Sequence, residues 1–137
     1  MNTVTLIYYD PKSQKENREP IISIDQLEER LVYLQQQFQF DDLYIGAILL
    51  DEKGNELDIG LMPENWLLVV TIGSQVDAQY YSMGEAYTSG DIPFYWQQWT
   101  PMPKKFLVPK QKAWDVVKHW IDTGKLSDNI NWSSKAF

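Results

Sequence analysis

Two segments of the chain carry apolar residues at helical spacing, and the long stretch between them has the pattern of strands. The first segment begins at Ser23, which forms a capping box with Gln26. The second begins at Pro109, which suits the first turn of a helix, and stops at Gly124. The apolar stripes consist of Ile24, Leu27, Leu31, Leu34 and Phe38, and of Ala113, Val116, Val117, Trp120 and Ile121. We therefore predict two amphipathic helices.

The other apolar segments are rich in β-branched and aromatic residues, which predicts strands. In chain order they are residues 3–9, 43–51, 56–61, 66–73, 78–85, 92–100 and 130–133. The second and third are expected to form a hairpin, and 78–85 and 92–100 to run antiparallel. Residues 10–22 are polar, contain two prolines and predict a surface loop. We expect a single α+β domain over residues 1–137, with an antiparallel sheet of five to six strands and both helices mainly on one face.

The width of such a sheet determines how much of it the helices can cover. Five or six strands about 4.8 Å apart span roughly 20–25 Å, whereas two helices about 10 Å across cover one face only. Large apolar side chains nevertheless occur at both the odd and the even positions of the strands, which point to opposite faces of the sheet. Phe94 and Trp96, for example, alternate with Tyr95 and Trp99. Two outcomes stay open. Either an aromatic patch is exposed for a partner, or sheet curvature and loops bury these rings.

The charge is high and unevenly distributed. The formal net charge is −7, with −11 in residues 1–100 and +4 in residues 101–137. Nucleic acid and anionic lipid are disfavoured as partners, because phosphate binding needs clustered Lys and Arg, and a basic partner fits better. No apolar run is long enough to span a bilayer and the first residues lack a signal pattern, so we expect a cytoplasmic protein without a membrane partner.

The sequence offers little catalytic machinery. It contains no cysteine and a single histidine, His119, which falls on the surface of the second predicted helix. Nucleotide, zinc-protease and serine-hydrolase motifs are absent from the sequence. A glycosidase would need two carboxylates across a cleft, and the carboxylate pairs are weak candidates because they flank turns or links. These pairs are Asp41/Asp42, Asp51/Glu52 and Glu56/Asp58. We expect neither an enzyme nor a cofactor or metal.

The last third of the chain, from Phe94 to Trp132, carries a family resemblance. Its motifs are Trp99-Thr100-Pro101-Met102-Pro103, then Leu107-Val108-Pro109, then a helix ending Trp120-Ile121-Asp122-Thr123-Gly124, then Trp132. This arrangement resembles the first-numbered immunity protein family of bacterial polymorphic toxin systems. Pro101 and Asn131 stand where that family usually has acidic residues. The resemblance implies a small α+β protein that binds and neutralises a cognate toxin, often a nucleic-acid deaminase, inside the producing cell.

A contact surface for such a toxin follows from the aromatic and acidic residues together. The hypothesis places on it the strand residues Tyr95, Trp96, Gln97 and Trp99, the neighbouring Glu85, Tyr87 and Asp91, and the steering acids Asp41, Asp42 and Asp58. The acids would stand in for phosphate on a basic toxin surface, so that the toxin's active site or substrate surface is occluded without any reaction. Core packing is the competing interpretation for each ring. The free protein is expected to be a monomer or a weak homodimer.

Two other function classes remain open. Tyr95 and Trp99 together would also suit a small-ligand or carbohydrate-binding module, in which aromatic rings stack on a sugar. A structural subunit whose aromatic face pairs with a second copy is the other alternative.

Overall fold

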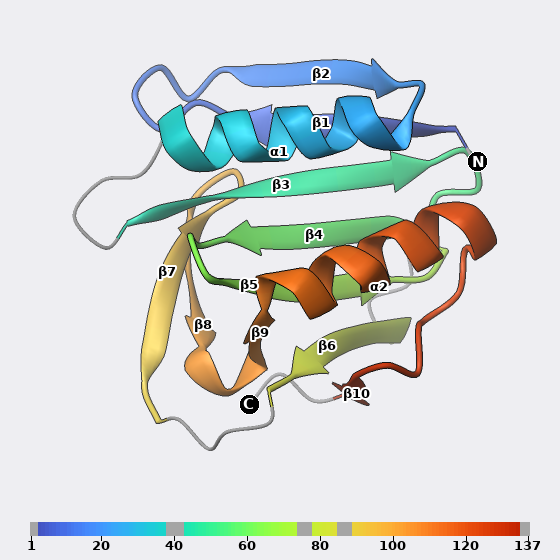
Figure 1. Ribbon diagram of the computed structural model, residues 1–137. Helices are drawn as coiled ribbons and strands as arrows, with labels where there is room; N and C mark the ends of the chain where they lie inside the picture. Colours follow the sequence, from blue (N-terminus) through green and yellow to red (C-terminus); the bar gives the residue numbers. More distant parts are fainter. Residues whose placement is uncertain (1–2, 38–42, 74–77, 85–88, 135–137) are drawn as a thin grey trace.

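The computed structural model describes residues 3–37, 43–73, 78–84 and 89–134 (Figure 1). Its two helices are α1 (Ile24–Gln37) and α2 (Lys110–Thr123), and a short 3-10 helix, η2, covers Lys104–Phe106. The strands are β1 (Val4–Tyr9), β2 (Glu16–Ile21), β3 (Tyr44–Asp51), β4 (Glu56–Leu61), β5 (Asn65–Thr71), β6 (Gln79–Met83), β7 (Asp91–Tyr95), β8 (Trp99–Pro103), β9 (Leu107–Pro109) and β10 (Asn131–Ser133). The expected α+β class with two helices is confirmed, and so are the 43–61 hairpin and the short strand near the end of the chain.

The strands form one open sheet with β4 near its centre. The order is β10-β6-β5-β4-β3-β1-β2, and every neighbouring pair in this series is antiparallel. Strand β9 adds to β5, and a β7–β8 hairpin joins through a two-residue parallel pairing of β7 with β3. The expected number of five to six strands is wrong, because the described residues form ten. Several of the additional strands are short, and backbone pairing rather than side-chain pattern defines them.

Two segments differ from the sequence-based expectation. The predicted surface loop at 10–22 contains β2, an edge strand with alternating exposed side chains that pairs with β1 along its whole length. The predicted strand at 92–100 is instead a hairpin: β7 turns at residues 96–98 and returns as β8, and β6 pairs with β5 and β10 rather than with β7. Pro20, Pro101 and Pro103 are tolerated because edge strands leave one row of backbone N–H groups unused.

Both helices begin where the sequence indicates, and α2 also ends where it indicates, whereas Phe38 of the first predicted stripe lies outside the described residues. Ser23 Oγ accepts a hydrogen bond from the Gln26 N–H at 3.1 Å, while Gln26 Oε1 accepts from the N–H of Ile22, one residue further back than in the usual capping box. Helix α2 follows Pro109 directly and ends at Gly124, whose φ of 72° suits glycine. In Figure 1 the two helices lie on the same side of the sheet. Their apolar stripes pack with one face of the strands into the larger core.

The second face of the sheet is covered at one end by the β7–β8 hairpin. In Figure 1 the hairpin crosses the ends of β3 and β4 at a steep angle to them. It forms a smaller core that consists of Tyr44, Leu67, Val69, Ile92, Phe94, Met102 and Phe106. Ser82 ties η2 to this region: its hydroxyl donates to the Phe106 carbonyl at 2.6 Å and accepts from the Leu68 N–H at 3.0 Å. Of the two outcomes that the sequence left open for this face, burial of the rings therefore holds at the hairpin end.

Two paired glycines allow the hairpin to approach the sheet. Gly46 of β3 lies opposite Gly60 of β4, and both are buried. A Cβ atom at Gly60 would lie 2.7 Å from Cε1 of the Phe94 ring, and one at Gly46 would overlap the indole of Trp96. The rings of Phe94 and Trp96 thus occupy the space that two side chains would fill.

We predict that Gly60→Ala destabilises the protein by about 1–3 kcal/mol, the usual cost of overpacking a core. This loss exceeds the gain of about 0.5–1 kcal/mol that alanine normally brings to a strand. Urea unfolding measures the change. In a Phe94→Leu background the same substitution should cost less, because the smaller side chain leaves room. An unchanged unfolding midpoint for Gly60→Ala alone would contradict the proposed contact.

Candidate partner-binding site

The hairpin separates its side chains into an inner and an outer set. Ile92 opposite Met102, and Phe94 opposite Thr100, lie on the side that packs against the sheet. Tyr95 and Trp99 form the outer pair next to the turn, with their ring centroids 5.1 Å apart and their planes at 58°. The alternation noted in the sequence therefore corresponds to two sides of one hairpin.

The tip of the hairpin exposes one large ring. Trp99 retains 43% of its surface exposed, and the adjacent Gln97 and Gln98 are exposed as well. Tyr95 is only 4% exposed, so the expectation that it belongs to an open face is wrong. It instead packs beneath Trp99 and fixes the position of that indole. A sugar stacking on both rings, as in the carbohydrate-binding alternative, has no access to the Tyr95 ring.

Trp96 follows the core-packing interpretation. Its indole lies over Gly46, is partly buried, and stands 5.4 Å from the ring of Phe94. Its Nε1 atom is buried without a hydrogen-bond partner. Trp96 therefore holds the turn against β3 and is not an exposed contact residue.

Asp91 lies at the opposite end of the hairpin from the exposed tip. It is exposed and pairs with Pro103, whereas the tip begins at Tyr95, about 13 Å further along an extended strand. Asp91 lines a depression of about 430 Å³ beside the hairpin base, together with Tyr44, Met62, Ile92, Pro93, Lys104 and Leu107. The structure thus does not bring Asp91 next to Trp99.

Asp58 occupies a position that sequence reasoning did not foresee. Leu57, Ile59 and Leu61 point to the helices, so Glu56, Asp58 and Gly60 share the second face of β4. Asp58 is partly buried, and its Oδ1 atom is fully buried. The pKa of its carboxyl group is raised well above the ordinary value, first by burial, then by a side-chain hydrogen bond with Glu56 and by the charge of Glu56. The signal available in sequence was an acid within the apolar alternation of a central strand.

The remaining proposed contact residues, Asp41, Asp42, Glu85 and Tyr87, lie outside the described residues. His119 is exposed on α2, as expected. In the described ranges no group of histidine and acidic residues is arranged to hold a metal ion. No helix in the same ranges is long and apolar enough to cross a membrane.

A scan against models of protein families found no match, and neither did a search of curated proteins.

We predict that Asp58→Asn stabilises the protein near pH 7, by about 3–5 °C in melting temperature if the change is on the order of 1 kcal/mol. A raised pKa means that the folded state binds the proton more tightly. Stability is therefore lost as pH rises from the ordinary carboxyl pKa through the raised folded value. The advantage of the variant should disappear below about pH 4, where Asp is protonated in both states. Thermal melts between pH 3 and 8 measure it.

The matched control is Asp91→Asn, which removes the same charge from an exposed position and should change the melting temperature little. A difference between Asp58→Asn and the parent protein that does not vary with pH would contradict the buried acid.

Proposed function

We propose that this protein is a non-catalytic immunity protein that binds a cognate bacterial toxin and occludes its active site or substrate surface. A toxin that acts on nucleic acid, such as a deaminase, fits best. The observation that carries the proposal is the exposed indole of Trp99 at the tip of a hairpin whose other rings are packed.

The hairpin tip has the properties of an interface anchor. Tryptophan is the residue type most enriched among side chains that dominate binding energy, and a fixed ring loses little conformational entropy on binding. Trp99 packs on the buried Tyr95, and the turn before it is held by Trp96 over Gly46. The neighbouring Gln97 and Gln98 supply uncharged hydrogen-bonding groups. This arrangement supports recognition of a protein surface.

The charge of the molecule supports the same partner class. A toxin that binds nucleic acid carries a basic surface, and an inhibitor with a net charge of −7 is attracted to it. Such attraction accelerates association, which an inhibitor needs in order to act before the toxin reaches its substrate.

The segment that resembles immunity proteins, the last third of the chain, can be located in the fold. Residues 94–132 run through β8, η2, β9, α2 and β10, which include the strand that carries Trp99 and the helix that supports β5. The resemblance therefore concerns the part of the fold that presents the proposed anchor.

We predict that Trp99→Ala weakens the complex with the toxin domain encoded by the neighbouring gene at least about 30-fold, as expected for an anchor worth about 2 kcal/mol. Biolayer interferometry measures the affinity, and rescue of growth on co-expression measures neutralisation. Tyr33→Ala is the matched control, because Tyr33 is 42% exposed on α1, far from the hairpin tip in the sequence. A neighbouring gene that encodes no toxin, or equal affinities for both variants, would refute the proposal.

A further inference from the structure

Several aromatic rings in the described part of the chain have a cation of the same chain over their face. The guanidinium carbon of Arg30 lies 4.8 Å from the centroid of the Tyr33 ring, and Lys118 Nζ lies 5.8 Å from the Trp114 ring. Trp99 is as exposed as Tyr33, 43% against 42%, yet within the described ranges no cation lies over its indole. The exposed part of this ring is therefore open to a cation from outside.

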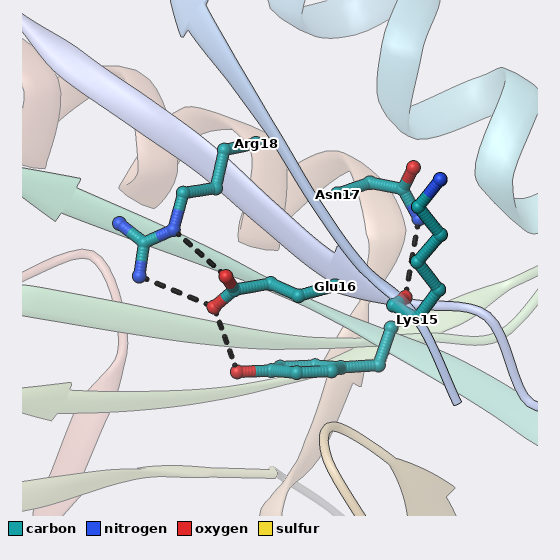
Figure 2. Close-up of polar contacts among 5 residues, drawn as sticks. Lys15, Glu16, Asn17 and Arg18 are labelled. Atoms are coloured by element: carbon teal, nitrogen blue, oxygen red, sulfur yellow. Dashed lines mark hydrogen bonds and ion pairs between the residues drawn. The ribbon is translucent and has the colours of Figure 1, made fainter.

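The chain's own arginines are engaged elsewhere. Figure 2 shows the guanidinium of Arg18 against the carboxylate of Glu16, with Nε 3.1 Å from Oε2. Arg30, the other arginine of the sequence, pairs with Glu19 at 2.9 Å. The hairpin segment 92–103 contains no charged side chain. A cation at the hairpin tip therefore has to come from another molecule, which the net charge of −7 attracts.

The backbone of β8 adds hydrogen-bonding groups beside this ring. Pro93 lies opposite Pro101 in the hairpin, and neither has an N–H group. Hydrogen-bonded and non-hydrogen-bonded pairs alternate in an antiparallel ladder, so the two prolines form a non-hydrogen-bonded pair. The Lys104 N–H donates to the Gly90 carbonyl at 2.9 Å, which fits the same alternation. The backbone groups of Trp99 and Pro101 therefore point away from β7.

This free edge favours a partner group that donates hydrogen bonds and accepts none. Among the described strands β8 pairs with β7 alone, and both Trp99 and Pro101 are exposed. Trp99 presents one N–H and one carbonyl group, whereas Pro101 presents a carbonyl group only. An added strand would need donors for its own carbonyl groups, and the edge supplies too few of them. The side chains of arginine and lysine carry donors without acceptors and fit it better.

We propose that Trp99 receives an arginine side chain of the partner protein, with the guanidinium group stacked on the indole and donating to the carbonyl groups of Trp99 and Pro101. This inference rests on the proposed function and names the partner residue that the anchor contacts. A guanidinium group is planar, so it can lie against a ring while its N–H groups reach acceptors at the side. The compact, strongly hydrated ammonium group of lysine is less suited to both contacts.

The position of Tyr95 agrees with this arrangement. Tyr95 contacts the Trp99 ring from β7, so we expect the exposed part of the indole on the side of the free edge. A toxin that acts on nucleic acid supplies the arginine, because such proteins contact phosphate groups through arginine and lysine side chains. Trp99 would then remove a group that the toxin needs for its substrate.

The first test compares hexa-arginine and hexalysine peptides by isothermal titration calorimetry at pH 7. Both peptides carry the same charge, so general attraction to the acidic protein is matched and the difference reports the guanidinium group. The parent protein should bind hexa-arginine at least about threefold more tightly, as expected for a cation over an exposed ring. The proton–nitrogen NMR signal of the Trp99 indole should shift more with hexa-arginine than with hexalysine.

Three variants locate the preference for hexa-arginine. Trp99→Leu keeps an apolar side chain and should bring the ratio of the two affinities towards one. Pro101→Ala returns an N–H donor to the edge and should reduce the ratio as well. Tyr33→Leu is the matched control, because it removes an equally exposed ring that already has a cation, and it should leave the ratio unchanged.

The assignment is wrong if the parent protein binds both peptides equally, if the Trp99 indole signal does not move, or if Trp99→Leu retains the full preference. Loss of folding in Trp99→Leu, visible in a thermal melt, would leave a second variant. A fluorinated tryptophan at position 99 keeps the size of the ring but withdraws electron density from its face, and it should reduce the preference without disturbing the packing.

A second test separates this contact from the proposed function. The fluorinated tryptophan should weaken the toxin complex at least about threefold. If Trp99→Ala weakens the complex and the fluorinated ring does not, the indole is an apolar anchor only, so the arginine contact is wrong and the immunity function stands. If the parent protein binds no toxin, the proposed function fails, and the peptide titrations alone then decide whether Trp99 accepts a guanidinium group.

Discussion

The packing of the β7–β8 hairpin against two glycines organises the second half of the molecule. Because Gly46 and Gly60 have no side chains, the rings of Trp96 and Phe94 lie directly on β3 and β4. That contact closes the smaller core and turns Tyr95 and Trp99 to the outer side of the hairpin. The exposed indole is therefore a consequence of what is buried beneath it, and the hairpin is both a cover for the sheet and a support for the candidate site.

The carboxyl pair of β4, unlike the ring packing of the hairpin, lowers the stability of the folded protein near pH 7. Central strands of a sheet normally carry apolar residues, yet Asp58 stands there with one buried oxygen and with Glu56 as its neighbour on the same face. Arg18, three strands further out on β2, forms an ion pair with Glu16. Burial and the neighbouring Glu56 carboxyl group together favour the protonated form of Asp58 in the folded protein.

Parts of the candidate site were accessible from sequence and parts were not. The alternation of Phe94 and Trp96 with Tyr95 and Trp99 indicated two sides, but it did not reveal that the segment turns at residues 96–98 or which side faces the sheet. Asp58 was grouped with solvated acids because it stands close to a hairpin turn. Its burial depends on the strands on both sides of β4, which place Ile48 and Val69 beside it.

The sequence alone determined the two helices, where both begin, where the second ends, and most of the central strands, because capping residues and apolar periodicity act over a few residues. It also determined the acidic charge and the absence of cysteine chemistry. Only the tertiary structure decided that β2 and β8 are strands, that the hairpin covers one end of the second face, and that Tyr95 is buried while Trp99 is exposed. Phe94 and Trp96 pack on Gly60 and Gly46, which are far from them in the chain, and a local sequence pattern does not record such contacts.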